Sequence, residues 1–288
     1  MRDSILCAAA LAVLPLAPAS AAEPDGAALT ARYAPAVVGL RLTLRTEVEG
    51  SGAPPEETTD ETVGVVVDPS GLILLWNSHI SSGRMADLFS EMSGQGGFRL
   101  QVTATDVRVT LPGEGRERRA FVAAADSDLD LAFVQLEERP EAPLASVDFR
   151  RAAAVAVGDV LVAVSRLSSS FDRAPFFDLV RVVGRVEKPR PAWILGAGNA
   201  TQAGLPYFAA DGRPVGVLVT VVSRAGEATS PDASRLFAEM LSLGRGESEV
   251  GPIGLFLLPA ERVQSRIELA LERAKELLAE RAAAAAGE

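Results

Sequence analysis

The stretch VVVDPSGLILLWNSHI, residues 65–80, decides the fold of this chain. Two short apolar runs flank Asp68–Gly71, in which a proline presets the backbone for the second position of a tight turn. We therefore expect a β-hairpin with strands at Thr62–Val67 and Leu72–Trp76. The second strand ends just before His79, the only histidine of the chain, so the hairpin delivers an imidazole to a loop.

Strand patterns continue on both sides of this hairpin. Alternating residues over Pro35–Thr46 predict a first strand, whereas the composition of Glu47–Glu61 predicts an exposed acidic loop. Further strands are expected at 99–103, 107–111, 120–124, 130–136, 159–164, 179–186, 206–209, 214–222 and 254–258, and short helices at 84–92 and 233–243.

These strands fall into two consecutive runs of about six, separated by the proline-containing segment Glu137–Pro143. We expect an all-β fold of two six-stranded β-barrels, at about 33–137 and 150–258. One amphipathic helix at about 260–281 closes the chain, with Pro259 suited to its first turn.

Composition excludes several classes of protein. The chain has 288 residues, a formal charge of −10 and a pI near 4.8, which argues against nucleic acid as a main ligand. With 48% apolar and 23% charged residues, it has the composition of a globular protein and not of a disordered chain.

The first 21 residues have the pattern of a secretory signal peptide. Arg2 precedes an apolar run from Ile5 to Leu16, and Ala19-Ser20-Ala21 forms a small-residue cleavage site. A run of this length is too short to span a bilayer, so we expect a periplasmic or secreted mature domain, 22–288, without a stable membrane anchor. Cys7, the only cysteine, lies in this segment, so the mature chain has no disulfide and no thiol nucleophile.

A second stretch, ADSDLDLAFV at residues 125–134, places Asp130 at the start of an apolar strand. Together with the stretch around His79, it resembles the trypsin-like fold in its bacterial HtrA/Deg form. That family shows "VIxxxGxILTNNHV", then "DxxxDLAVLK", then "GNSGGPL". The first pattern keeps Asn77 and His79, and the second keeps Asp126 and Asp130.

The resemblance extends over about residues 33–280. It includes a "VGD" at 157–159, the segment ADGRPVGV at 210–217 and the segment GLFLLP at 254–259. No PDZ domain is expected after the closing helix, and the oligomeric state stays open.

The resemblance implies that His79 is the general base and Asp130 its orienting carboxylate, in the chymotrypsin-type order. Aligned on Pro206, the nucleophile position is Ala203; aligned on Gly198-Asn199, it is Ala200. A methyl group can neither be deprotonated nor form an acyl-enzyme. Thr201 and Leu205 also replace glycines of the family motif, which disturbs the expected oxyanion hole.

The leading hypothesis is therefore a catalytically inactive trypsin-like domain that binds proteins or peptides, by strand addition along Val217–Val222. One alternative is an active endopeptidase with a displaced nucleophile, for which Thr201 and the Ser168–Ser170 triplet offer hydroxyls. Another is a scaffold in which His79 and Asp130 only stabilise the fold. The sequence holds no ligand set typical of a metal site and no phosphate-binding loop, so no cofactor is expected.

Overall fold

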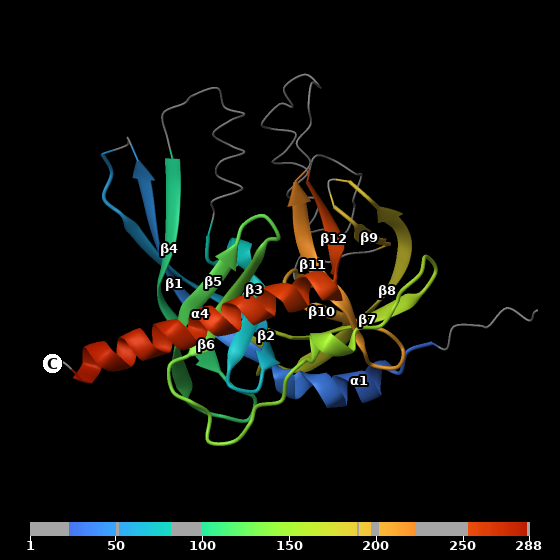
Figure 1. Cartoon of the computed structure of the whole chain (residues 1–288), viewed down its shortest axis with the longest axis horizontal. Coiled ribbons are helices and arrows are strands. Elements are labelled where there is room, and N and C mark those ends of the chain that lie inside the picture. Colours follow the sequence, from blue (N-terminus) through green and yellow to red (C-terminus); the bar gives the residue numbers. More distant parts are fainter. Residues whose placement is uncertain are drawn as a thin grey trace, which may run out of the picture.

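The computed structural model of the protein describes residues 23–49, 52–81, 99–188, 190–196, 202–222 and 253–286. Their strands form two closed, antiparallel, six-stranded barrels, which confirms the expected all-β double barrel. Figure 1 shows the barrels side by side, with the long C-terminal helix running across them.

The N-terminal barrel has the strand order β1-β2-β3-β6-β5-β4. Its bounds are β1 Val37–Glu49, β2 Glu56–Asp68, β3 Leu72–Trp76, β4 Arg99–Thr110, β5 Glu117–Asp126 and β6 Leu131–Leu136. The predicted hairpin is β2–β3, and its turn is closed by a 3.0 Å hydrogen bond from Gly71 N to Asp68 O.

The C-terminal barrel has the order β10-β11-β12-β9-β8-β7. Its bounds are β7 Val160–Arg166, β8 Pro175–Val186, β9 Ala192–Leu195, β10 Pro206–Phe208, β11 Pro214–Val222 and β12 Ile253–Pro259. Asp211-Gly212 turns the chain between β10 and β11, where Gly212 has a φ of +80° and donates to Ala209 O over 2.8 Å.

Apolar side chains form three cores. One fills each barrel, and the third lies between the barrels and beneath the helices. Four consecutive residues of β3, Leu72–Leu75, are fully buried because the strand turns one face into its own barrel and the other into the shared core.

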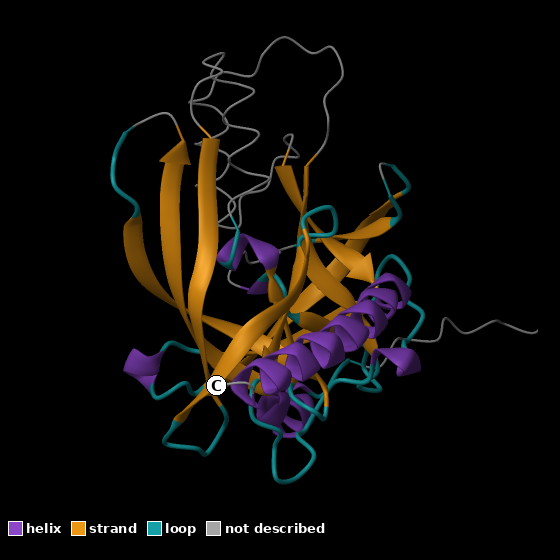
Figure 2. Cartoon of the chain, turned by 60° about the vertical axis from the view of Figure 1, so that its left-hand side comes forward, coloured by secondary structure: helices purple, strands orange, loops and turns teal. Residues whose placement is uncertain are grey.

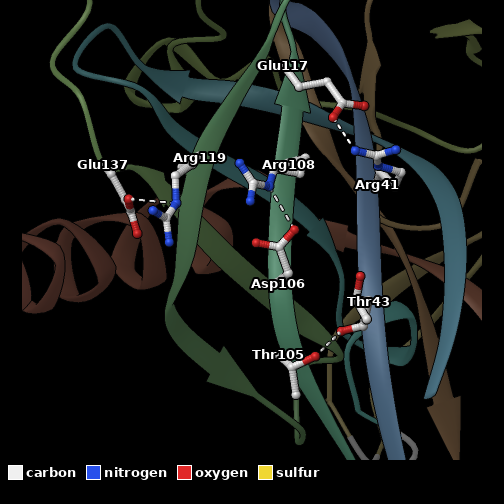
Figure 3. Close-up of polar contacts among 8 residues, drawn as sticks. All are labelled: Arg41, Thr43, Thr105, Asp106, Arg108, Glu117, Arg119 and Glu137. Atoms are coloured by element: carbon white, nitrogen blue, oxygen red, sulfur yellow. Dashed lines mark hydrogen bonds and ion pairs between the residues drawn. The ribbon is translucent and has the colours of Figure 1, made fainter.

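Two sequence predictions about strands were wrong. The predicted acidic loop Glu47–Glu61 is mostly strand, because β1 and β2 pair far beyond the barrel core, down to Thr46 opposite Glu56. The expected strands at 99–103 and 107–111 are one strand, β4, in which a bulge inserts Thr105. The Thr105 hydroxyl donates to Thr43 O over 3.2 Å at this bulge (Figure 3).

Two elements were not predicted, namely β9 and the helix α1, Gly26–Tyr33, which Asp25 caps through Ala28 N at 3.0 Å. Pro259 ends β12 and does not enter the closing helix, which begins at Ala260. The signal peptide, the helices expected at 84–92 and 233–243 and the alternative nucleophile position Ala200 lie outside the described residues.

The outside of the N-terminal barrel is polar. Arg41, Arg108 and Arg119 lie in register on three neighbouring strands. Acidic partners separate these like charges: Glu117 bonds Arg41, Asp106 accepts from Arg108 Nε at 2.7 Å, and Glu137 lies 3.4 Å from Arg119 Nε (Figure 3).

The closing helix, α4 Ala260–Ala286, buries one apolar face against both barrels, as its pattern predicted. Val263, Ile267, Ala270 and Ala274 of this face are almost fully buried. Figure 2 shows the helix lying along one side of the strands. Within the described part of the chain, no helix combines the length and apolarity that crossing a membrane requires.

Candidate active site

The end of β3 positions His79. A 3-10 helix, Asn77–His79, follows the strand and is held by hydrogen bonds from Asn77 N to Asp130 O at 3.1 Å and from Ile80 N to Asn77 O at 2.9 Å. The imidazole packs edge-on against the ring of Trp76, with 5.1 Å between ring centroids. Its Nε2 atom lies 2.8 Å from the hydroxyl oxygen of Thr62, on β2.

Burial controls the charge of His79. Desolvation lowers the pKa of this imidazole to about 4, although the nearby carboxylate of Asp60 acts in the opposite direction. The ring is therefore neutral at pH 7, and its unprotonated nitrogen can accept a proton.

Asp130 lies in the turn before β6, with a φ of +58° that is uncommon for a residue with a side chain. It is 5% exposed. Its carboxylate accepts hydrogen bonds from Trp76 Nε1, from Ser78 Oγ at 3.2 Å and from Thr220 N at 3.1 Å. Burial raises the pKa of this carboxyl, and the three hydrogen bonds partly offset that effect.

His79 and Asp130 thus lie close in the chain's fold, but their side chains bond to different partners. Asp130 is bonded by Trp76, Ser78 and Thr220, and His79 by Thr62. None of the hydrogen bonds described for these two residues joins the imidazole to the carboxylate.

The segment with Ala203 is anchored on both barrels. Gly204 N donates to Leu218 O over 2.7 Å, and Leu205 N donates to Gln202 O over 3.0 Å. Gly204 has a φ of +82°, and a Cβ atom there would lie 2.3 Å from Trp76 N at the end of β3. Only glycine fits this conformation and this close approach.

Ala203 itself is 4% exposed. Beside it, Gln202 is almost fully buried; its Oε1 accepts from the Tyr207 hydroxyl at 2.6 Å and its Nε2 donates to Asp178 Oδ2 at 3.1 Å. This buried network fixes the main chain next to Ala203. Thr201 lies outside the described residues, whereas Ser168–Ser170 lies at the start of the β7–β8 loop.

The sequence predicted His79, Asp130 and Ala203 as site residues, but not the residues that hydrogen-bond to His79 and Asp130. Trp76 and Ser78 stood in the quoted motif, and a buried indole N–H requires an acceptor, which was a usable signal. Thr62 and Thr220 carried no signal, since their contacts depend on strand pairing and on how the barrels pack.

A metal centre finds no support in the residues described. No group of three or more histidine, cysteine, aspartate or glutamate side chains there could hold an ion.

Comparisons with known proteins concern the fold and the family of the chain. A family model for a trypsin-like peptidase domain matches residues 62–217. No curated protein sequence matches the chain. Among solved structures, the HtrA-type protease AlgW with a decapeptide is 17% identical, with a TM-score of 0.51 over 85% of this chain and 67% of that chain. The MamO protease domain from Magnetospirillum magneticum, in its apo form, is 15% identical, with a TM-score of 0.45 over 82% of this chain and 97% of that domain.

The AlgW structure shares the fold of this chain. The family model covers more than half of the 288 residues, from β2 to β11. The matched range includes the strand ends that carry His79 and Asp130 and the segment around Ala203. The chain therefore belongs to the trypsin-like peptidase domain family.

Proposed function

We propose that this chain is a catalytically inactive trypsin-like domain that acts by binding proteins or peptides. In this account His79 and Asp130 are remnants of the catalytic triad, and Ala203 occupies the nucleophile position. An alanine side chain has no oxygen that His79 could deprotonate. The apolar segment Ile5–Leu16 supports a periplasmic or secreted location for the domain.

The hydrogen bonding of Asp130 carries the proposal. A working triad needs this carboxylate to orient the imidazole and to stabilise its charged form. Here Trp76, Ser78 and Thr220 donate to the carboxylate, and His79 bonds Thr62 instead. The missing hydroxyl at Ala203 and the absence of a hydrogen bond between His79 and Asp130 are two departures from an active protease, and both support an inactive domain.

The binding surface that we propose is one edge of β11. The main-chain groups of Leu218 on this edge are already used, because they hydrogen-bond to Gly204 and Leu205. The part of Val217–Val222 that can accept an added strand is therefore Thr220–Val222. Thr220 N points to the same side, toward Asp130. Because main-chain groups of alternate strand residues face the same edge, the N–H and C=O of Val222 face it too and can pair with an added peptide strand.

A binding assay tests this surface. Fluorescein-labelled casein, an extended chain, is titrated with the purified protein and followed by fluorescence anisotropy. Val222→Pro removes the outward N–H and should raise the Kd about tenfold, whereas the control Val222→Ala should leave it within about twofold. Equal affinity of both variants and the unaltered protein would exclude strand addition at this edge.

One observation favours a second candidate function, an endopeptidase with a displaced nucleophile. The Thr62 hydroxyl lies 2.8 Å from His79 Nε2, within the reach of a nucleophile and its base. Thr62→Val keeps the shape and removes the oxygen. If Thr62 is a nucleophile, the unaltered protein cleaves casein and this variant does not; on our proposal, neither cleaves it.

A further inference from the structure

A hollow of about 700 Å³ lies away from the candidate active site, where α1, the segment 145–152 and residues 212–214 meet. None of His79, Asp130 and Ala203 lines it. Its wall holds four arginines, Arg32, Arg150, Arg151 and Arg213, but only one carboxylate, Asp148. A second carboxylate, Asp211, lies beside the wall and pairs with Arg213. We call this hollow the arginine hollow.

The charge of the arginine hollow is opposite to that of the chain. Four guanidinium groups in the wall, set against Asp148 in the wall and Asp211 beside it, leave a local excess of two positive charges in a protein whose formal charge is −10. Such a reversal of sign at a concave site concentrates anions.

The two carboxylates orient the arginines without using all their donors. Asp148 accepts from Arg150 Nε at 2.8 Å and lies 4.0 Å from Arg151 Nε, and Asp211 accepts from Arg213 Nε at 2.7 Å. Because these contacts use the Nε atoms, the terminal nitrogens remain for a ligand, apart from a 3.4 Å contact of Arg213 Nη1 with Ala152 O.

Arg32 is held in a different way. None of the ion pairs described in the structure includes it. Its guanidinium lies 5.0 Å from the centroid of the Tyr33 ring, which stacks on Phe208 with 3.9 Å between centroids and donates its hydroxyl to Gly212 O. A buried aromatic platform therefore fixes a cation at the wall, so little side-chain freedom is lost when a ligand binds.

We infer that the arginine hollow is a binding site for a phosphate group carrying two negative charges. A phosphate monoester has a charge of about −1.5 to −2 at pH 7, which matches the excess of two, and planar guanidinium groups bind its oxygens in pairs. The group can belong to a free phosphate compound or to a lipid headgroup; the chemistry of recognition is the same.

The test is calorimetric titration of the purified protein with inorganic phosphate. Arg32→Ala removes the platform-held cation, and Arg151→Ala removes a side chain that is 78% exposed and contributes little to folding. Arg116→Ala is the matched control, since Arg116 is 64% exposed and lies, like Arg151, 4.0 Å from an acidic partner, but outside the hollow. Thermal unfolding without ligand verifies that each variant folds.

We expect the Kd to rise about tenfold in Arg32→Ala, about threefold or more in Arg151→Ala, and less than about twofold in Arg116→Ala. Absence of binding to the unaltered protein at millimolar inorganic phosphate would overturn the proposal. So would an equal loss in all three variants, which would reveal attraction to surface arginines in general.

A second arm identifies the source of the phosphate. Flotation with phosphatidylcholine vesicles is compared with and without phosphatidic acid, whose headgroup is a phosphate monoester. Flotation that requires phosphatidic acid, Arg32 and Arg151 assigns the hollow to a lipid headgroup. Binding of inorganic phosphate without flotation assigns the hollow to a free phosphate compound. Flotation that is unchanged in both variants contradicts a role of the hollow in binding lipid.

Discussion

Gly204 sits where the loop next to Ala203 touches the backbone of β3. Its φ of +82° is strained for any residue with a side chain, and a Cβ would lie 2.3 Å from Trp76 N. The backbone of β3 cannot retreat, because β2 and β6 pair with it on either side. The glycine thus maintains the contact between the Ala203 segment and the strand that carries His79.

Gly204→Ala should therefore lower the free energy of unfolding by about 3 kcal/mol, the sum of backbone strain and displaced packing. Urea unfolding followed by tryptophan fluorescence measures the change. The matched control is Gly113→Ala, where φ is +77° but no atom lies within 4 Å of the added Cβ; it should lose only about 1 kcal/mol. Equal losses at both positions would show that the contact with β3 contributes nothing.

His79 makes stability depend on pH. The pKa of His79 in the folded protein is about 4, below the ordinary histidine value of 6.5, so the unfolded chain binds more protons than the folded chain between these two pH values. The contribution of His79 to the free energy of unfolding is complete above pH 6.5 and is lost as the pH falls toward 4. Asp130 has the opposite effect on the pH dependence of stability. Burial raises the pKa of its carboxyl, so its contribution to stability is lost as the pH rises.

Comparison with a variant isolates the histidine. Between pH 7 and pH 4, the unaltered protein should lose about 3 kcal/mol more stability than His79→Gln, which keeps a polar side chain near Thr62 but does not titrate. Urea unfolding at a series of pH values gives the difference. Parallel stability curves for the two proteins would mean that His79 is not desolvated in solution.

At the level of single residues, the motifs predicted where His79 and Asp130 lie but not what they bond. The sequence places both residues at strand ends, and strand ends are local features. Thr62 reaches His79 only because β2 pairs in one register, and Thr220 reaches Asp130 only because the barrels pack together. Such long-range geometry leaves no trace in a local pattern.

At the scale of elements, the extended β1–β2 hairpin shows why polar strands are hard to predict. The pairing continues through Arg45 opposite Glu57, where no apolar alternation marks a strand. Strand pairing between β1 and β2 holds this part of the hairpin, whereas Arg45 forms its ion pair with Glu47 of its own strand, at 2.8 Å. The composition of this segment predicted a loop. Apolar and polar residues alternate only where one face of a strand is buried, so a strand without a buried face lacks the pattern that identifies it.

The helix α4 is tied to the turn that carries Asp130. Arg266 Nε lies 2.8 Å from Asp126 Oδ2, while Asp126 Oδ1 accepts from Leu129 N at 2.9 Å. One carboxylate thus joins the helix to the turn immediately before Asp130. Because the Arg266 side chain is 41% exposed, the ion pair contributes modestly to overall stability.

Arg266→Ala should lower the free energy of unfolding by about 1 kcal/mol or less, yet speed hydrogen exchange at the Leu129 and Asp130 amides. Exchange followed by mass spectrometry measures the local effect. Arg273→Ala, which removes ion pairs within α4 only, should leave these amides unchanged. Identical exchange at these amides in both variants would show that the ion pair of Arg266 with Asp126 does not stabilise the turn.

At the scale of the whole molecule, Arg166 joins the two barrels. It extends from β7, and its guanidinium donates to three carbonyls: Val37 O at 2.8 Å, Ala34 O at 2.7 Å and Arg173 O at 2.9 Å. Desolvation lowers the pKa of this arginine. The guanidinium of Arg166 thus links the C-terminal barrel to the start of β1. Its charge is stabilised by carbonyl oxygens and not by carboxylates.

Removing this cation should weaken the packing of the barrels. Arg166→Met, which keeps the length of the side chain, leaves three carbonyls without their donor and should cost about 2–4 kcal/mol in urea unfolding. The control Arg185→Met removes a surface arginine that is 50% exposed and should cost less than about 0.5 kcal/mol. Similar losses in both variants would contradict the role of Arg166.

The double barrel itself could be predicted because its strands leave a strong local pattern. Continuous apolar runs such as Leu72–Leu75 come from strands that face a barrel interior on one side and the shared core on the other. The first helix, α1, and β9 were missed, because one is short and weakly amphipathic and the other has only four residues. The pairing order within each barrel came from the structure.

The most direct test of the central claim is the intact mass of the purified protein after exposure to a fluorophosphonate, beside the His79→Ala variant. We expect no adduct on either protein, because Ala203 has no hydroxyl and Asp130 does not bond His79. One adduct per chain on the unaltered protein, absent from His79→Ala, would contradict it and establish an active peptidase.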